Sequence, residues 1–394
     1  MVSGTEVKMK VLFVMHDDDK FGAPQSMLKM IELLKKNDHI YPIVLTPKKN
    51  RVNEKCSIMG IENYSLCYRT DHYNQKNVSI NFYINVIINF VINIYFFHRI
   101  KKIVNIEEIN IIHSAVSTES QGLRMSKKFN IPLVVHLREM GVDNRFSHQQ
   151  IVELSSGTQK FIAISRIVSD YWILMGIDEN KIEIIYNGID NNDIKTKENY
   201  FLKQNLSVIL VSNISPEKGI HIAIDAMKMA KNFFPDLSKV LKMDIVGSYQ
   251  KKNQKYFKKL KNEIVENELL DTVHFLGYLT NVSKMLYKYD VGIMSSKAEA
   301  FGRTTVEYMM AGLPVVASNS GANPELIKDN KDGFLYNPGS AEDLIDKLIY
   351  IYRNKADAKK IGQNARKTAL NKYTAEHNAH QVFRVYEETI LEQS

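Results

Sequence analysis

Residues 290–318, DVGIMSSKAEAFGRTTVEYMMAGLPVVAS, decide the fold that the sequence predicts. They begin with a short apolar run that has the length and composition of a buried strand, and a helical pattern follows. The helical pattern starts near Gly302 and ends at Gly312, with Pro314 just beyond, as helix boundaries commonly do. A second apolar run comes next. Strand, helix and strand in this order are typical of a parallel sheet that carries helices on its faces.

The same alternation occurs twice along the chain. In the first half, strands are predicted at KVLFVMH, YPIVLTP, INIIHSA, PLVVHLRE, KFIAIS and KIEIIYNGID. A polar stretch, NNDIKTKENYFLKQN, follows, and strands resume at LSVILVSNI, KMDIVGS, TVHFLGY, DVGIMSS, GLPVVAS and GFLYN. We therefore predict two Rossmann-like, doubly wound α/β domains, residues 1–190 and 191–375, that face each other across a ligand-binding cleft, with a last helix over residues 376–394.

The composition indicates a folded protein and limits the cellular compartments in which we expect it. At 394 residues, with 44% hydrophobic and 24% charged residues, the chain is expected to form two or three domains. Its two cysteines, Cys56 and Cys67, are too few for a disulfide framework or a cysteine-rich zinc site, and they fit a reducing compartment. The start, MVSGTEVKMKVLFVMHDDD, lacks a signal-peptide pattern, so we expect a cytoplasmic protein, with the inner face of the cell membrane as a peripheral location.

The formal charge of +8 favours an acidic partner. An anionic membrane face and a phosphorylated small molecule both qualify, and a merely solvated basic surface remains the alternative. The lysines are scattered, and the sequence has no zinc-finger, RNP or basic-zipper pattern, so we expect no nucleic acid.

One apolar segment, NVSINFYINVIINFVINIYFFHRIKK, places an asparagine at every fourth position from Asn77 to Asn93. On a helix this spacing makes one polar stripe. So many amides disfavour a membrane-spanning helix. A helix that lies on a membrane surface, with Arg99, Lys101 and Lys102 at its end, is one alternative. We favour an amphipathic helix packed on its own sheet.

Several common catalytic and binding motifs are absent from the sequence. It contains no G-x-x-x-x-G-K-[ST], G-x-G-x-x-G, G-x-S-x-G or H-E-x-x-H, and its histidines are dispersed without metal-ligand spacing. These absences disfavour a nucleotide kinase, a simple dinucleotide dehydrogenase, a serine hydrolase and a zinc enzyme. We expect neither a metal nor a cofactor.

The loop and helix after the first apolar run of residues 290–318 suit a nucleotide that carries a sugar. Gly302 lets a ligand approach the backbone, and the amides of the helix start attract an anion such as a diphosphate. Glu307 lies one turn after Arg303, and its two carboxylate oxygens can bind the diol of a ribose. Glu299, in the loop, can bind the hydroxyls of the sugar.

Two further loops join a strand to a helix. In VILVSNISPEKGIHIAIDAM, Lys218 stands between Pro216 and Gly219, where its ammonium can neutralise a leaving diphosphate. A solvated lysine is the alternative. In HDDDKFGAPQSML, Gly22 would let the backbone of the first domain reach the same diphosphate.

These pieces together resemble the retaining GT-B glycosyltransferases of family four, also called glycosyl transferases group 1. The resemblance rests on FGAPQSM, AISRIVSDYWILMGI, IYNGID, SPEKGIHIAIDAM, VHFLGYL and SSKAEAFGRTTVEYMMAGLPVVASNSGANPELI, and on DGFLYNPGSAEDL, and it is most specific from Asn187 to Asp346. It implies an amino-terminal acceptor domain, a carboxyl-terminal nucleotide-sugar domain, a last helix that crosses back to the first domain, and transfer with retention and without a metal.

Carried over by position, the resemblance assigns Glu299 to the donor sugar, Glu307 to the ribose, Lys218 to the diphosphate and Gly22 to the closing phosphate loop. The neighbouring residues expected at the donor are Phe301, Gly302, Arg303, Thr304 and Asn213. Asn213 is a departure, because many relatives carry an arginine there. The residue after the motif glycine is often apolar in relatives, and we hypothesise that Arg303 replaces the missing charge. A surface arginine is the alternative.

A second departure lies in PLVVHLREMG. The family often has a histidine near the end of this strand, next to the reacting sugar. His136 and Arg138 alternate onto one strand face, and Arg138 stands at the usual position. The pair is our candidate for this role, with a satisfied core histidine as the alternative for His136. Glu139 is a candidate for acceptor hydroxyls.

We therefore expect a glycosyltransferase that moves a sugar from a nucleoside diphosphate sugar, with uracil as the favoured base, to a saccharide or lipid-linked glycan in surface polysaccharide or glycoconjugate synthesis. A non-catalytic partner subunit that keeps the fold and binds the nucleotide sugar is the first alternative. A GT-B sugar-nucleotide epimerase is the second.

Overall fold

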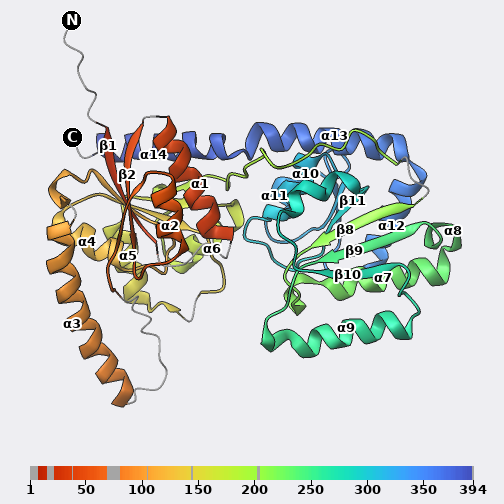
Figure 1. Ribbon diagram of the computed structural model, residues 1–394, viewed down its shortest axis with the longest axis horizontal. Helices are drawn as coiled ribbons and strands as arrows, with labels where there is room; N and C mark the ends of the chain where they lie inside the picture. Colours follow the sequence, from red (N-terminus) through yellow and green to blue (C-terminus); the bar gives the residue numbers. More distant parts are fainter. Residues whose placement is uncertain are drawn as a thin grey trace, which may run out of the picture. The chain divides into compact units, whose positions relative to one another are not determined.

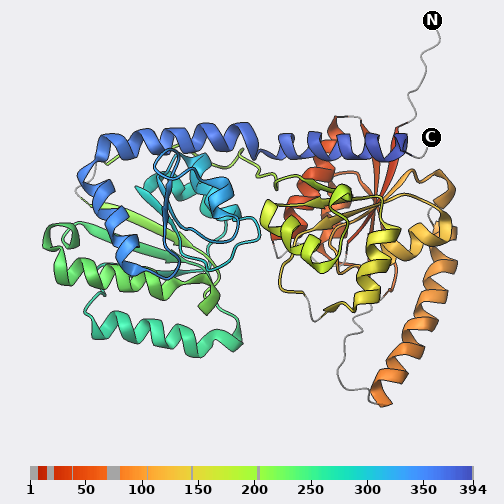
Figure 2. The same ribbon diagram turned by 180° about the vertical axis from the view of Figure 1, so that it is seen from behind.

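The computed structural model describes residues 8–15, 22–37, 39–68, 80–103, 105–142, 145–201 and 205–392, and only the backbone of residues 22–23, 80–87 and 103. The chain forms two compact units (Figures 1 and 2). Unit 1 comprises Met1–Gly188 together with Ala375–Ser394, and unit 2 comprises Ile189–Thr374. The last stretch of the chain therefore lies in the same unit as the first.

Unit 1 is built on a parallel sheet of seven strands in the order β3-β2-β1-β4-β5-β6-β7. Its strands are β1 Met9–Val14, β2 Ile40–Thr46, β3 Glu62–Ser65, β4 Ile111–Ser114, β5 Leu133–Leu137, β6 Lys160–Ala163 and β7 Ile182–Ile184. Its helices are α1 Gly22–Lys36, α2 Arg51–Ile58, α3 Ile80–Ile103, α4 Gln121–Phe129, α5 His148–Gly157, α6 Arg166–Met175 and α14 Ala375–Leu391.

Unit 2 is built on a parallel sheet of six strands in the order β10-β9-β8-β11-β12-β13. Its strands are β8 Leu206–Val211, β9 Leu241–Val246, β10 Val273–Gly277, β11 Val291–Met294, β12 Val315–Ser318 and β13 Phe334–Tyr336. Its helices are α7 Ile220–Phe233, α8 Pro235–Ser238, α9 Gln254–Glu266, α10 Arg303–Ala311, α11 Asn323–Leu326, α12 Ala341–Arg353 and α13 Lys355–Lys372.

These two sheets confirm the predicted fold class of paired Rossmann-like domains. In each sheet the strand order reverses beside the first strand, at β1/β4 and at β8/β11, and this switch point is where such sheets bind ligands. The structure adds one strand that the sequence did not predict. β3, ENYS, is polar and pairs only with β2 at the edge of the sheet, so it lacks the apolar run that marks a buried strand.

The central strands are buried on both faces, which explains their unbroken apolar sequences. Residues 11–14 of β1, VLFV, have no exposed surface. Burial of one such side chain contributes about 1.5–3 kcal/mol to folding. Helices therefore cover both faces of the sheet, as Figures 1 and 2 show from opposite sides.

The predicted asparagine-striped helix is present as α3, and its described asparagines, Asn89 and Asn93, lie on the side of α4. A helix packed on its own sheet should direct its asparagines to solvent and its apolar residues inward. In the described part of α3, Asn89 is buried, and the Asn93 Oδ1 accepts a hydrogen bond of 2.7 Å from Gln121 Nε2. Phe96 and Ile100 are also buried, whereas Phe90 and Ile94 are exposed. The Gln121 amide allows this arrangement because it gives an inward-facing asparagine a polar partner.

Among the described residues, no helix is both long enough and apolar enough to cross a bilayer.

A buried polar chain ties α14 to the sheet of unit 1. The Tyr386 hydroxyl lies 2.5 Å from His113 Nδ1, and His113 Nε2 lies 2.7 Å from His136 Nδ1, both as hydrogen bonds. All three side chains are without exposed surface. The last helix is therefore anchored by a directional polar contact in addition to the packing of its apolar face against α1.

We predict that Tyr386→Phe lowers the free energy of unfolding by about 1–3 kcal/mol, because it leaves a buried imidazole nitrogen without its partner. Tyr350→Phe is the matched control, since the Tyr350 hydroxyl bonds Asp357 at the exposed surface and its loss should cost little. Chemical denaturation of the two variants measures the difference. Equal stability of both variants would contradict an anchoring role for the buried chain.

Candidate active site

The predicted donor residues gather at one edge of the sheet of unit 2. β8 and β11 are parallel neighbours, so their carboxyl ends lie side by side. The loop from Ser212 to Gly219 follows β8, and the loop from Ser295 to Gly302 follows β11. The two loops are joined by hydrogen bonds from Ser295 Oγ to the Lys218 carbonyl, 2.8 Å, and from the Lys297 amide to the Glu217 carbonyl, 2.9 Å.

Lys218 and Glu299, one from each loop, form an ion pair. Lys218 ends a short 3₁₀ turn, Pro216–Lys218, and the left-handed Gly219 follows it and begins α7. Both charged side chains remain partly accessible to solvent, at 28% and 16% of their surface. The structure thus brings together the two residues that the sequence assigned to the diphosphate and the donor sugar.

The close approach of these loops depends on glycine. A Cβ at Gly219 would stand 2.1 Å from the Ser295 carbonyl oxygen, and one at Gly321 would stand 2.4 Å from the Glu299 amide nitrogen. Both glycines have positive φ, +64° and +58°, which side chains disfavour. Gly321 precedes Ala322, whose amide donates to the Glu299 carbonyl at 2.9 Å. The backbone on either side of Glu299 is therefore held in place.

Helix α10 presents an open amino terminus beside this pair. Its N-cap is Gly302, in the left-handed conformation at φ +85°, with no capping side chain and no acidic residue in the first turn. The helix itself is fixed, because Thr305 Oγ1 donates to Asn323 Oδ1 at 3.0 Å and the Tyr308 hydroxyl accepts from the Val211 amide at 2.7 Å. An uncapped, rigid helix start suits an anion.

Arg303 and Glu307 lie one turn apart on α10, with 3.8 Å between Arg303 Nη2 and Glu307 Oε1. Burial raises the pKa of Glu307 above its ordinary value, and the nearby Arg303 opposes that rise. A quarter of the Glu307 side chain is nevertheless accessible, so a ligand can reach its carboxylate.

The remaining donor candidates differ in exposure. Phe301 is buried and stacks edge-on against Tyr373, with 6.2 Å between ring centroids, so only its backbone can face a ligand. Thr304 is half-buried and Asn213 is exposed. Gly22 is the first residue of α1, and the loop that precedes it, residues 16–21, lies outside the described part of the chain.

In unit 1 the structure separates the two candidates on β5. His136 lies within the strand, fully buried in the chain with His113, whereas Arg138 lies just beyond the strand end. The Arg138 guanidinium donates to the Ala115 carbonyl at 3.2 Å and to Asn187 Oδ1 at 2.7 Å. His136 is therefore a core residue, but its Nε2 is buried without a hydrogen-bond partner in the described part of the chain, so it is not a satisfied one. Arg138 is the residue nearer the edge of the sheet.

Glu139 is hydrogen-bonded to a residue that lines a cavity, which the sequence did not reveal. Its Oε2 accepts from Ser117 Oγ at 3.1 Å. The loop of Ser117 follows β4 and lines a cavity of about 350 Å³ together with Phe146, Gln150 and the buried Glu119. Loop residues after β4 carry no motif, and only the adjacency of β4 and β5 brings them beside Glu139.

Two family models match the chain, and together they span most of it. Glycosyl transferases group 1 matches residues 191–368, and Glycosyltransferase Family 4 matches residues 58–193. The chain belongs to the family-four glycosyltransferases. The family prediction from the sequence is confirmed, and the two matches meet close to the boundary between the two units.

Relatives and solved structures agree with this family. An uncharacterized glycosyltransferase of Methanocaldococcus jannaschii is 27% identical over 84% of this chain and 91% of its own. The amylovoran biosynthesis glycosyltransferase AmsK of Erwinia amylovora is 28% identical over 59% of this chain and 56% of its own. The crystal structure of Anabaena HepE, determined with UDP, has a TM-score of 0.78 at 22% identity and covers 96% of this chain and 100% of its own. These likenesses confirm the GT-B fold.

We predict that Gly219→Ala destabilises unit 2 by several kcal/mol, because its Cβ would collide with the Ser295 carbonyl in addition to straining the backbone. Gly339→Ala is the control. Gly339 has φ +84° with nothing within 4 Å of its Cβ position, so it should suffer only backbone strain, about 1–2 kcal/mol. Thermal unfolding compares them. If Gly219→Ala is no worse than Gly339→Ala, the loops are not held by this contact.

The buried histidines also predict how stability depends on pH. Burial, together with the charge of Arg138, lowers the pKa of His113 to about 3 and that of His136 well below its ordinary value. The unfolded chain binds protons at these imidazoles below about pH 6.5, whereas the folded chain does not, so stability falls as the pH falls through that value. Burial raises the pKa of Glu119 to about 7, and between about pH 4.5 and pH 7 this carboxyl opposes one histidine.

We expect His136→Gln to reduce the loss of unfolding free energy on acidification by about 1.4 kcal/mol per pH unit below about pH 6. Urea denaturation at several pH values measures this slope, which is informative even where the variant is less stable overall. His380→Gln, on the exposed side of α14, should leave the slope unchanged. An unaltered slope in His136→Gln would mean that His136 is not held neutral.

Proposed function

We propose that this glycosyltransferase transfers a sugar from a UDP-sugar to a saccharide or lipid-linked glycan acceptor in the synthesis of a surface polysaccharide or glycoconjugate. The observation that carries the proposal is the gathering of Lys218, Glu299, Arg303 and Glu307 at the carboxyl edge of one sheet. The structural relative HepE was crystallised with UDP and with UDP-glucose, and AmsK acts in amylovoran biosynthesis. The HepE complexes support a UDP-sugar as the donor, and the AmsK name supports a role in polysaccharide synthesis.

The residues of unit 2 supply complementary charges for such a donor. Glu307 binds the ribose diol through its two oxygens, while the open start of α10 and the Arg303 guanidinium bind the diphosphate. Without a donor, Lys218 neutralises Glu299. With a donor, the diphosphate offers Lys218 a stronger anion, and Glu299 is released to accept hydrogen bonds from the sugar hydroxyls. The pair is partly solvated, so its separation costs little.

We further propose that the transfer proceeds with retention and without a metal. The bond from the anomeric carbon to the diphosphate oxygen breaks, and the bond to the acceptor oxygen forms on the same face. The acceptor hydroxyl gives its proton to the leaving phosphate. Lys218 and Arg303 stabilise the charge that develops on that phosphate, which is the task a metal ion would otherwise perform.

Unit 1 supplies the acceptor residues in this proposal. Glu139, held by Ser117, is placed to accept from acceptor hydroxyls, and Arg138 is the cation at the end of β5. His136 then acts as a buried support for the sheet and does not touch the sugar. Two other activities remain as outcomes of the experiment, namely a partner subunit that binds the donor without catalysis and an epimerase that needs no acceptor.

We predict that UDP stabilises the purified chain more than GDP, ADP or CMP do, without added metal and in the presence of a chelator. At about 100 times its dissociation constant, a ligand should add about 2.7 kcal/mol, which a thermal-shift assay detects. Glu307→Gln should weaken this stabilisation through the ribose, and Arg303→Gln through the diphosphate. Glu342→Gln and Arg353→Gln, both on exposed positions of α12, are the matched controls.

Product analysis then separates the three activities. Incubation with a UDP-sugar and an acceptor should release UDP and give an axial or equatorial product anomer that matches the donor. Binding without UDP release would identify a partner subunit, and a new sugar nucleotide formed from the donor alone would identify an epimerase. No stabilisation by any nucleotide would overturn the donor site. Full stabilisation in Arg303→Gln would remove that residue from the diphosphate.

A further inference from the structure

Helix α3 carries several large apolar side chains on the face that points away from the protein. Phe90, Val91, Ile94 and Tyr95 are each more than half exposed, at 66%, 58%, 56% and 55%. At 100° per residue these positions form one continuous arc of the helix. The opposite arc holds the buried Asn89, Phe96 and Ile100. A surface helix normally buries its apolar arc and exposes its polar one. An exposed apolar arc therefore indicates that this face binds a partner.

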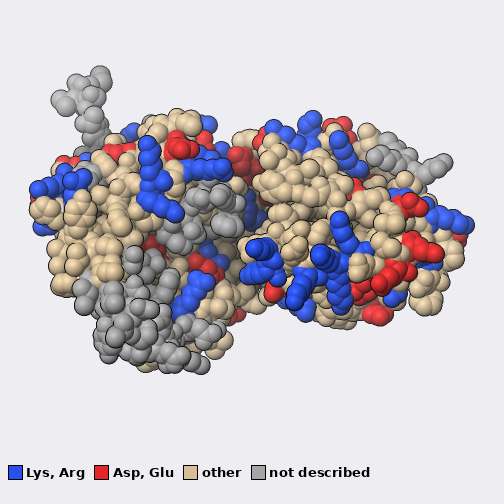
Figure 3. All heavy atoms as spheres, turned by 60° about the horizontal axis from the view of Figure 1, so that its bottom comes forward, with Lys and Arg blue, Asp and Glu red and all other residues tan. Residues whose placement is uncertain are grey.

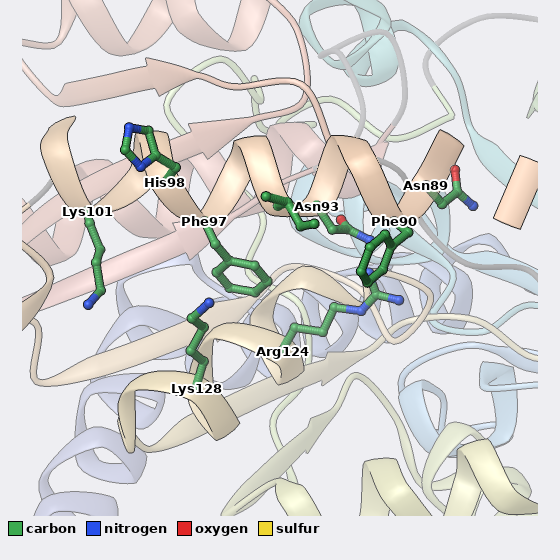
Figure 4. A pocket seen from close by; sticks show the side chains of 9 residues that line it. Asn89, Phe90, Asn93, Phe97, His98, Lys101, Arg124 and Lys128 are labelled. Carbon is green, nitrogen blue, oxygen red and sulfur yellow. The ribbon is translucent and has the colours of Figure 1, made fainter. Parts of the chain in front are cut away.

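Between α3 and α4 lies a cavity of about 630 Å³ that combines aromatic rings with cations (Figure 4). Phe90 and Phe97 of α3 point toward Arg124 and Lys128 of α4, and Lys101 enters from the carboxyl end of α3. The Lys128 ammonium lies 4.3 Å from the centre of the Phe97 ring. We call this cavity the α3–α4 pocket.

The α3–α4 pocket is positive. Its lining, as far as the structure describes it, contains Lys101, Lys128 and Arg124 and neither aspartate nor glutamate. Partial burial lowers the pKa of Arg124. Three cations are spread along the lining of one cavity, and no carboxylate stands among the described lining residues, so an anion in the cavity would be favoured. Lys102 and Arg99 extend the positive charge along the exposed end of the helix.

A second basic helix, α9, shows what an ordinary solvated surface looks like. Four lysines of α9 and two in the turn before it are exposed to solvent. Figure 3 shows Lys and Arg side chains gathered on the part of unit 2 that carries this helix. Its apolar residues Leu260 and Ile264 are buried. α9 exposes one large apolar side chain, Val265, and has no continuous apolar arc like that of α3. α3 has charge and such an arc together, which is the composition of a helix that binds at a membrane interface.

We propose that α3 and the α3–α4 pocket form a docking surface for an anionic phospholipid bilayer. The exposed arc of α3 enters the boundary between headgroups and acyl chains, and a headgroup phosphate binds among Lys101, Arg124 and Lys128. Charge complementarity identifies this occupant: the apolar arc needs an apolar phase, and the cations at its border need phosphate. The docking surface lies in unit 1 and uses no residue of the proposed donor site. The two proposals can therefore be tested separately, and failure of one does not contradict the other.

A second copy of the chain is a poorer occupant. Two copies paired symmetrically through α3 would bring the same patch onto itself, and thus Lys101, Lys102 and Lys128 of one copy near those of the other. Such like-charge contacts disfavour the pair. A bilayer that contains anionic lipid has no such conflict.

The experiment is sedimentation of the full chain with vesicles of phosphatidylcholine alone or mixed with phosphatidylglycerol. We expect binding to the mixed vesicles and little to phosphatidylcholine. Lys101→Gln/Lys128→Gln should weaken binding to the mixed vesicles by about ten-fold or more, because each cation near such a surface contributes appreciably. Phe90→Ala/Ile94→Ala should weaken it by about ten-fold as well, through lost apolar burial.

Two matched variants keep the test specific. Lys255→Gln/Lys258→Gln removes the same charge from α9, and Phe233→Ala/Leu270→Ala removes similar exposed apolar surface from unit 2. Both should bind vesicles like the unaltered chain. All four double variants change exposed side chains, so each should keep its melting temperature and its response to UDP.

Four results would overturn the proposal. They are absence of vesicle binding, equal binding to both vesicle types, equal loss in the α9 variant, and a chain that is dimeric by light scattering but becomes monomeric in Phe90→Ala/Ile94→Ala. A titration with inorganic phosphate addresses a soluble anion. Stabilisation by phosphate that depends on Lys101 and Lys128, without vesicle binding, would assign the pocket to a soluble phosphate compound.

Discussion

The close contact between the loops that follow β8 and β11 is the constraint on which the proposed donor site depends. Two neighbouring parallel strands end at the same edge, and the backbone at Gly219 then meets the Ser295 carbonyl at a distance that no side chain allows. That contact brings Lys218 to Glu299 although they are far apart in sequence. Gly321 braces Glu299 from the other side, and the anchored α10 supplies Arg303 and Glu307. A rigid backbone thus presents flexible charges, which is what binding of a multiply charged ligand requires.

Unit 1 uses buried polar groups for a different purpose. The chain from Tyr386 through His113 to His136 places polar atoms where apolar packing would serve equally well for stability, and it fixes α14 in one position on the sheet. Because burial keeps both imidazoles neutral, the folded state is more stable at neutral pH than at acidic pH. The acceptor candidates, Arg138 and Glu139, lie just beyond the end of β5. Arg138 is still buried and Glu139 is half-buried, so the chain becomes accessible to solvent only after the arginine.

Most of the fold was predictable from the sequence because buried parallel strands are continuous apolar runs, and all of those runs became strands. β3 was not predicted, because an edge strand needs no apolar run. The positions of the donor candidates at the strand ends were predictable because glycine and proline mark the turns around them. The cavity beside Glu139 was not, since Ser117 and Phe146 reach it from separate loops with no local pattern. The role of His136 was also left open, because alternation along a strand gives a face but not a depth.

The sequence by itself determined that two doubly wound sheets form, where their strands end, and which charged residues follow those ends. These properties follow from local periodicity and from turn residues, which each segment carries independently of the rest of the chain. Only the tertiary structure decided which way α3 faces. Its asparagine stripe predicts an outward polar face, but Gln121 of α4 offers Asn93 a partner inside, and the apolar arc is left outside. The orientation of a helix is set by the partners it meets, and those come from another part of the chain.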